Sequence, residues 1–295
     1  MIDRELLKEV RRIEIATKRM VNQAMAGSYL SVFKGQGMHF EEVRQYQPGD
    51  DVRTIDWNVS ARMQDLYVKR FVEERELTVM LLVDTSGSMS FGTRGREKRA
   101  LAARLAALFA FSAIKNNDQV GLILFSEEVE RFVPPKKGRT HVLRLVREIL
   151  EHESPARRTN IGRALEYLSR VTTRSSVAML LSDFLEPIAS YERELRIANR
   201  RHDLVPVVLE DPTERELPAV GLAAFEDPET GELVWVDTSS RAVQAEYRDL
   251  AAQEALQRDQ LFRRHRIDFV PLTTHLAYAQ PLVSLLRKRA RRAYH

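Results

Sequence analysis

Short apolar runs alternate with longer helical patterns from about residue 78 to the end of the chain. Strand-like runs lie at 78–84, 120–125, 176–182, 203–209 and 267–272. Apolar residues recur at helical spacing in 96–115, 140–151, 160–171, 240–265 and 278–292. Strands separated by helices of this length are typical of βαβ units. The pattern therefore predicts an α/β fold with a Rossmann-like, doubly wound and mainly parallel sheet.

Two other parts of the chain have patterns of their own. The stretch EDPETGELVWVDT, with Gly231 in its turn, predicts a hairpin at the edge of the sheet. In residues 1–77, a helix at about 2–25 precedes a polar, β-rich segment with a tight turn at 48–50. This segment is too short and polar to hold a large core alone. We therefore expect residues 1–77 to form a helix and a β-rich appendage packed on an α/β domain of residues 78–295.

Composition excludes several classes of protein. The chain has no cysteine, and its histidines show no HxxxH or HExxH spacing, so a zinc site is not expected and a metal would use oxygen or histidine ligands. Its 46 basic and 42 acidic residues are nearly balanced, unlike those of a nucleic-acid binder. No apolar run approaches the roughly 20 residues that span a bilayer, and the N-terminus is too charged for a signal peptide. We expect a soluble, cytoplasmic protein.

Oxygen-bearing side chains follow two of the predicted strands. In VDTSGSMSFG, Asp84 ends a strand and Ser86 and Ser88 follow at alternate positions. Asp183 ends a second strand in VAMLLSDF, and Thr159 precedes a helix in RRTNIGRAL. Because parallel strands end at one edge of a sheet, these five side chains can converge there. Such oxygens suit Mg²⁺ or Mn²⁺, and three neutral hydroxyls would leave the ion able to take an Asp or Glu from a partner protein.

The order and spacing of these residues carry a family resemblance. Asp84-x-Ser86-x-Ser88, with Thr159 and Asp183 later in the chain, resembles the metal-ion-dependent adhesion site (MIDAS) of von Willebrand factor A-type (vWA) domains over about residues 78–210. The resemblance implies a vWA fold in which Ser86, Ser88 and Thr159 touch the metal while Asp84 and Asp183 act through water or hydrogen bonds. One departure is Phe184, where many vWA domains have glycine.

A second segment extends the resemblance to nearly the whole chain. YQPGDDVRTIDWNVSAR resembles the signature that precedes the vWA core in a bacterial family of unknown function whose members accompany MoxR-type AAA+ ATPases. The resemblance implies such an ATPase as partner and joint, chaperone-like remodelling or maturation of a client protein. Charges around a turn also commonly form a solvated or ion-paired face. With that alternative open, the candidates for partner binding are Arg44, Asp50, Asp51, Arg53, Asp56, Trp57 and Arg62.

Enzymatic alternatives use the same loop. A hydrolase would need the G-x-S-x-G turn around Ser86, but Asp84 and Ser88 occupy the glycine positions. A Mg²⁺-dependent phosphatase could use Asp84 as nucleophile, yet Ser86 stands where a second, proton-donating acid is usual. The chain also lacks GxxxxGK[ST], so we do not expect it to hydrolyse ATP. A non-catalytic interaction module is favoured, and a hydrolase with Asp84 or Ser86 as nucleophile is the alternative.

Overall fold

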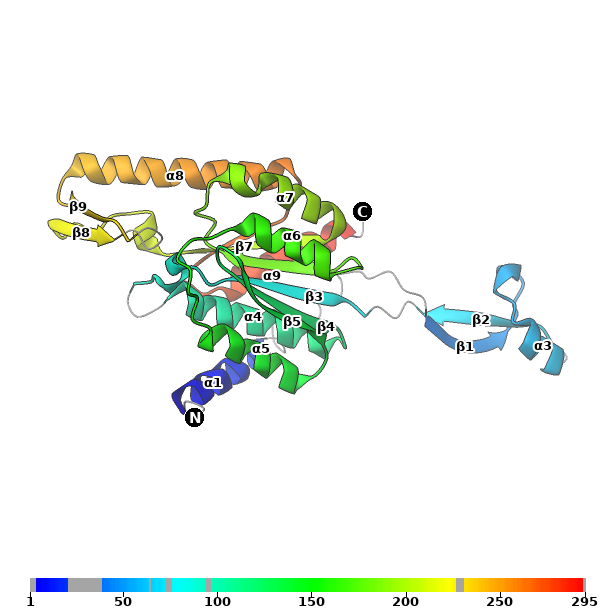
Figure 1. Ribbon diagram of the computed structural model, residues 1–295. Coiled ribbons are helices and arrows are strands. Elements are labelled where there is room, and N and C mark those ends of the chain that lie inside the picture. The colour runs from blue at the N-terminus through cyan, green and yellow to red at the C-terminus, as the bar shows by residue number, and fades with distance from the viewer. Residues whose placement is uncertain are drawn as a thin grey trace. The chain divides into compact units, whose positions relative to one another are not determined.

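A computed structural model describes residues 4–20, 39–63, 65–72, 76–93, 97–226 and 231–293. The chain divides into two compact units, one of residues 34–77 and one of residues 1–33 with 78–295 (Figure 1). This division differs from the expected one in the N-terminal helix, which belongs to the α/β unit. Among the described residues, no helix has the length and apolar character needed to cross a membrane.

The α/β unit is built on a six-stranded sheet of order β10-β7-β6-β3-β4-β5. Five strands are parallel, and β5 pairs antiparallel with β4. The doubly wound, mainly parallel sheet predicted from the sequence is confirmed. The strands are β3 (Thr78–Asp84), β4 (Gln119–Phe125), β5 (Val129–Lys136), β6 (Val177–Ser182), β7 (Asp203–Glu210) and β10 (Val270–Thr273).

Strand β5 was not predicted. Its sequence VERFVPPK contains two prolines, which remove ladder donors and count against a central strand. Because β5 lies at the edge of the sheet, it tolerates them.

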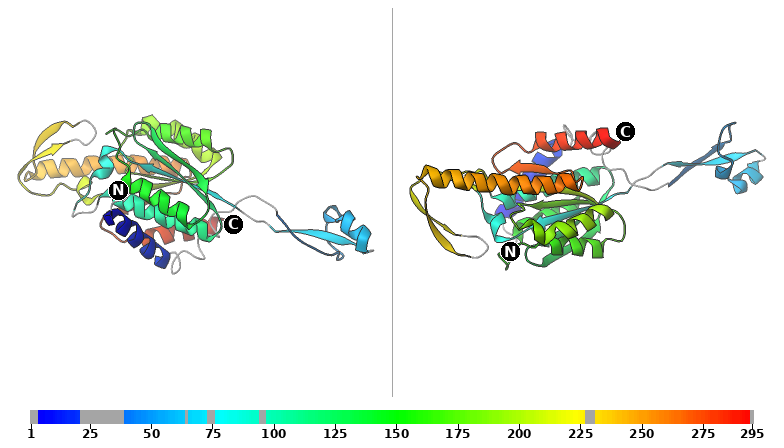
Figure 2. Two further views of the ribbon diagram at one scale, coloured as in Figure 1. Left: turned by 60° about the horizontal axis from the view of Figure 1, so that its bottom comes forward. Right: turned by 90° about the horizontal axis from the view of Figure 1, so that it is seen from above.

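Helices cover both faces of the sheet (Figures 1 and 2). One face carries α4 (Lys98–Lys115) and α5 (Arg139–Glu151), with α1 (Arg4–Met20) packed against both. The other carries α6 (Ile161–Val171), α7 (Ile188–Arg201) and the C-terminal part of α8 (Arg241–Arg264). The final helix, α9 (Ala279–Ala293), contacts β10. Helix α7 was missed because charged residues dilute its apolar stripe of Tyr191, Leu195 and Ala198.

Alternation along β3 explains the two-sided core. Met80 and Leu82 belong to the apolar cluster shared with α6, α7 and α8. Alternate residues of a strand point to opposite faces, so Val79, Leu81 and Val83 point toward α4. Helix α4 is apolar nearly all round and is buried between the sheet and a second helical layer. Helix α1 belongs to that layer, where its Val10 and Ile13 are buried.

The predicted hairpin is present, but its predicted place was wrong. Strands β8 (Leu222–Glu226) and β9 (Leu233–Asp237) pair only with each other among the described residues, in a separate antiparallel sheet. The edges of the main sheet are β10 and β5 instead. The turn chemistry around Gly231, whose φ is +75°, was a sound local signal. It carried no information about which strand the hairpin would lie beside.

The unit of residues 34–77 contains the β structure that was expected. Strand β1 (His39–Gln45) pairs antiparallel with β2 (Tyr67–Val72), and the chain between them forms the 3-10 helix η2 (Val52–Thr54) and the short helix α3 (Trp57–Met63). Ile55 and Val68 are buried, and an isolated bridge joins them. Docking of this unit on the α/β unit stays a prediction.

Candidate functional site

The candidate site lies where the winding of the sheet reverses. Strand β3 has β4 on one side and β6 on the other. The chain therefore adds β4 and β5 on one side of β3 first, and then adds β6, β7 and β10 on the other side. Crevices of this kind, at the carboxyl ends of neighbouring parallel strands, are the usual ligand sites of open α/β sheets. Asp84 ends β3, and Asp183 directly follows β6. A hydrogen bond of 2.6 Å from the Ser182 hydroxyl to Asp84 Oδ2 ties the two strand ends together.

The loop after β3 holds three of the predicted residues. Asp84 Oδ1 accepts a hydrogen bond of 2.9 Å from the backbone N–H of Ser86. The hydroxyl oxygens of Ser86 and Ser88 lie 3.2 Å apart. All three side chains are buried, and a 3-10 turn, η3 (Gly87–Ser90), sets their spacing. The DxSxS segment is thus a compact cluster of oxygens.

Thr159 lies on a neighbouring loop. The Arg157 carbonyl of that loop accepts a hydrogen bond of 2.9 Å from Gly87 N–H, and Asn160 N–H donates to the Ser126 carbonyl at the end of β4, at 2.8 Å. Thr159 Oγ1 is buried and has no hydrogen-bond partner among the described residues. Because buried hydroxyls are nearly always paired, this one is expected to face a ligand.

Glu130 anchors the Thr159 loop. Its carboxylate accepts hydrogen bonds from Ser126, His152 and Ser154, the last at 2.5 Å, and from Thr85 Oγ1 at 3.3 Å. Burial alone would raise the pKa of Glu130, but these donors hold the pKa below its usual value. Sequence reasoning missed this anchor because Glu130 lies on the unpredicted strand β5.

Asp183 is paired with a lysine that sequence reasoning also missed. Lys98, at the start of α4, is fully buried, and its Nζ lies 2.7 Å from Asp183 Oδ2 and also contacts Glu214. Burial would lower the pKa of Lys98, but these two carboxylates outweigh burial and raise the pKa. Burial, together with the nearby charge of Asp183, raises the pKa of Asp84 to about 7. In the sequence, Lys98 stands among other charged residues in REKRAL, at the start of a predicted helix.

The residue after Asp183 explains the departure from the vWA pattern. Phe184 has φ of +57°, in the left-handed region that favours glycine. Its ring is buried and packs edge-on against Tyr191 and Phe262, at centroid distances of 6.1 and 5.4 Å. Aromatic packing therefore offsets the backbone strain that glycine would avoid.

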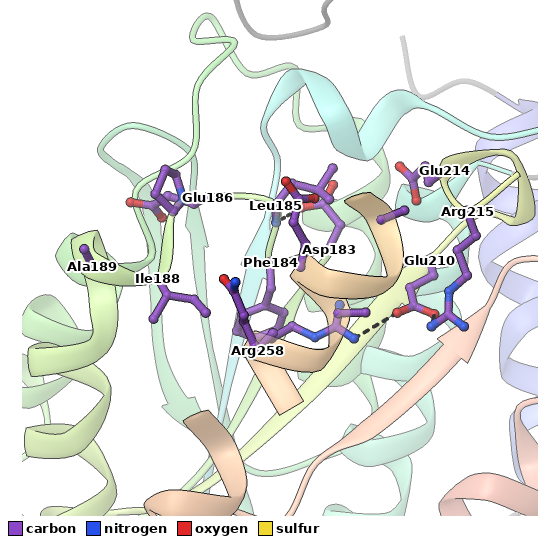
Figure 3. A pocket seen from close by; sticks show the side chains of 15 residues that line it. Asp183, Phe184, Leu185, Glu186, Ile188, Ala189, Glu210, Glu214, Arg215 and Arg258 are labelled. Atoms are coloured by element: carbon purple, nitrogen blue, oxygen red, sulfur yellow. Dashed lines mark hydrogen bonds and ion pairs between the residues drawn. The ribbon is translucent and has the colours of Figure 1, made fainter. Parts of the chain in front are cut away.

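A pocket adjoins the candidate site. It has a volume of about 430 Å³ and lies between the loop after β6, the end of β7 and helix α8. Figure 3 shows Asp183, Glu186, Glu210 and Glu214 around it, with Arg258 hydrogen-bonded to Glu210 at 3.0 Å. The lining therefore holds both acids and arginines, with Arg215 and Arg258 both paired with Glu210, and it includes Asp183 of the candidate site.

The candidate partner-binding residues of the 34–77 unit have mostly local contacts. Arg44 and Asp50 form an ion pair of 2.7 Å. Asp51 caps η2, and Asp56 Oδ1 accepts from the backbone at the start of α3. These contacts agree with the alternative that the charges around this turn form a solvated or ion-paired face. The remaining candidates are exposed at the surface: Arg53, Trp57 and Arg62.

We call Asp84, Ser86, Ser88, Thr159 and Asp183 the rim site. In the described part of the chain, no three His, Asp or Glu side chains gather to hold a metal ion. The rim site is of a different kind, with two carboxylates and three hydroxyls. Its paired serines and partnerless Thr159 hydroxyl fit a small, hard cation, which prefers oxygen ligands.

Comparison with known proteins places the chain in a family. Residues 42–257 match the sequence model of the family described as "Protein of unknown function DUF58". The chain belongs to the DUF58 family. This DUF58 protein is 35% identical to the uncharacterized protein Mb1516 of Mycobacterium bovis over 231 residues, which are 78% of this chain and 73% of that protein. It is 31% identical to the uncharacterized protein YeaD of Bacillus subtilis over 107 residues, 36% of this chain and 25% of that protein.

Solved structures match this DUF58 protein over much of its length. The conserved hypothetical protein BatB from Bacteroides thetaiotaomicron matches 73% of this chain and 99% of its own, with 15% identity and a TM-score of 0.50. A von Willebrand factor type A structure from Catenulispora acidiphila matches 77% of this chain and 44% of its own, with 14% identity and a TM-score of 0.37.

Proposed function

We propose that this DUF58 protein is a metal-dependent protein-interaction module. Ser86, Ser88 and Thr159 would hold Mg²⁺ or Mn²⁺, with Asp84 and Asp183 supporting the ion through water or hydrogen bonds. The bound cation supplies an electrophilic centre for an Asp or Glu side chain of the partner protein. The observation that carries the proposal is the buried Thr159 hydroxyl, which lacks a partner beside the Ser86 and Ser88 loop.

The proposed partner is a MoxR-type AAA+ ATPase, and the proposed setting is the cytoplasm. This assignment rests on the resemblance of the 46–62 segment and of the DxSxS, threonine and aspartate set. The joint task would be chaperone-like remodelling or maturation of a client protein. Membership of the DUF58 family is compatible with this proposal, since the family description names no activity.

The geometry of the rim gives a hydrolase less support. Asp84 is fully buried, and its two carboxylate oxygens already accept hydrogen bonds from Ser86 N–H and the Ser182 hydroxyl. A carboxylate held in this way is a poor nucleophile, since an attacking oxygen must reach the substrate. The Ser86 hydroxyl pairs with Ser88 and lies beside the Asp84 carboxylate, and among the described residues no histidine pairs with Ser86 to act as its base. Turnover of phosphomonoesters that is lost in Asp84→Ala would restore the phosphatase alternative.

A Thr159→Val variant tests the metal site. Valine has nearly the shape of threonine and removes only the partnerless hydroxyl, so the metal-free variant should be at least as stable as the wild type. Loss of one ligand should weaken Mg²⁺ or Mn²⁺ binding on the order of 10-fold or more. Titration calorimetry gives the affinity, and thermal unfolding with and without metal gives the stability.

Ser90→Ala is the matched control. Ser90 lies in the same turn, η3, but its side chain is exposed, so this variant should bind metal as the wild type does. Equal metal affinity in the wild type, Thr159→Val and Asp84→Ala would refute the rim site. If the site is correct, copurification of the ATPase from the native host should require Mg²⁺ and should be lost with Thr159→Val.

A further inference from the structure

A buried lysine stands behind the rim site, and the proposed function does not use it. Lys98 is the first residue of α4, and its side chain has no exposed surface. Removing an ammonium group from water is costly unless opposite charges surround it. Here Asp183, from the loop after β6, and Glu214, from the 3-10 helix η4 (Pro212–Glu214), both pair with it.

The position of the ammonium group does not depend on Asp183 alone. Glu214 Oε2 accepts a hydrogen bond of 2.8 Å from Asp211 N–H, in a capping box that fixes η4. Asp211 in turn accepts hydrogen bonds from Thr93 N–H at 3.0 Å and from the Thr274 hydroxyl at 2.8 Å. Lys98 is therefore held by a rigid network at the end of β7, and Asp183 meets a cation that is already in place.

This pairing changes what Asp183 can offer to a metal ion. One of its oxygens, Oδ2, is 2.7 Å from the ammonium group. A carboxylate whose charge is already balanced neutralises a second cation less well, because both cations compete for one negative charge. A metal at the rim would then face three neutral hydroxyls, the Asp84 carboxylate and an Asp183 carboxylate with reduced effective charge, and it would keep a strong attraction for an external carboxylate.

We propose that Lys98 is a positioning residue that sets the specificity of the rim site: by engaging Asp183, it withholds negative charge from the metal and reserves the metal for a carboxylate of the partner. This inference rests on the proposed function and adds the residue that tunes it. It predicts opposite effects of one substitution. Removal of the Lys98 charge should strengthen metal binding and weaken carboxylate binding.

The experiment uses the full chain with Lys98→Met, which keeps the length of the side chain and removes its charge. Titration calorimetry measures Mg²⁺ affinity, which should rise on the order of 10-fold, the effect of one nearby charge. Acetate is then titrated into the Mn²⁺-loaded protein, and water-proton relaxation reports the loss of metal-bound water. Acetate affinity should fall by a similar factor.

Two further variants keep the outcome decisive. Lys98→Met alone leaves two carboxylates, Asp183 and Glu214, without their cation. The double variant Lys98→Met with Glu214→Gln removes one charge of each sign, so only one carboxylate loses its cation and folding is disturbed less. Lys115→Met, at the exposed opposite end of α4, is the matched control and should change neither affinity.

The possible results separate this inference from the proposed function. Stronger metal binding with weaker acetate binding, in either folded Lys98 variant, supports the role of Lys98. Metal binding that is unchanged or weaker, or acetate binding that is unchanged, overturns it while the metal site stands. A wild-type protein that binds no divalent cation overturns the proposed function, and this inference with it.

Discussion

Replacing Phe184 by alanine and by glycine tests the backbone that carries Asp183. Phe184 combines a left-handed φ of +57° with a side chain that is only 5% exposed. Both substitutions remove the ring from its contacts with Tyr191 and Phe262. Loss of a buried phenylalanine typically costs about 3–5 kcal/mol of unfolding free energy. Both variants should therefore be clearly destabilised.

The difference between the two variants depends on the backbone alone. Alanine keeps the left-handed strain, which amounts to about 1–2 kcal/mol for a residue with a Cβ. Glycine removes this strain but adds about 0.5–1 kcal/mol of conformational entropy to the unfolded chain. Phe184→Gly should therefore be more stable than Phe184→Ala by about 0.5–1 kcal/mol.

Tyr191 provides the matched comparison. Its side chain is fully buried next to Phe184, but its backbone lies within helix α7. There Tyr191→Gly should be less stable than Tyr191→Ala by about 1 kcal/mol. Urea unfolding of the four variants, followed by circular dichroism, gives the two differences. If glycine is the less stable substitution at both positions, the left-handed conformation at Phe184 is refuted.

Two further predictions concern the α/β body. His202 is buried, and its Nδ1 lies 3.0 Å from the Ser176 hydroxyl; burial and then the charge of Arg201 lower its pKa to about 4. The unfolded chain takes up this proton near pH 6.5, so unfolding free energy should fall by at most about 3 kcal/mol between pH 6.5 and 4. Urea titrations should show a flatter profile for His202→Gln, and equal profiles would contradict the assignment. In α1, Ile13→Asp should lower the unfolding free energy by roughly 2–3 kcal/mol because Ile13 is buried, whereas Ile15→Asp, at a 62% exposed position, should have little effect. Equal effects in thermal unfolding would place α1 away from α4 and α5.

The sheet could be predicted because its strands are buried on both faces. Such strands form continuous apolar runs that stand out from the charged helices between them, as in β3 and β6. The same logic failed for β5, whose prolines are tolerated only because it lies at an edge. The predicted position of the β8–β9 hairpin was also wrong. Turn chemistry is local, whereas the choice of neighbouring strand depends on contacts across the whole unit.

The N-terminal helix shows how an apolar partner can be overlooked. We expected this helix, together with the rest of residues 1–77, to form an appendage packed on the α/β domain, and its Val10 and Ile13 are buried. Helix α4 requires neighbouring helices on the side away from the sheet, because its alanine-rich surface is buried nearly all round. A helix that is apolar on every side requires neighbours on every side. The composition of α4 therefore indicated a second helical layer, although it could not identify α1 as part of it.

The rim residues and the groups that support them differ in how they could be found. Asp84 ends one buried strand and Asp183 directly follows another, so topology alone brings them to one edge of the sheet. Lys98 reaches the same edge from the start of a helix, through contacts with residues 85 and 116 positions later in the chain. Nothing in its local sequence distinguishes it from a solvated lysine. The two acids of the rim site can therefore be expected from strand ends, whereas the lysine that pairs with Asp183 becomes visible only once the chain is folded.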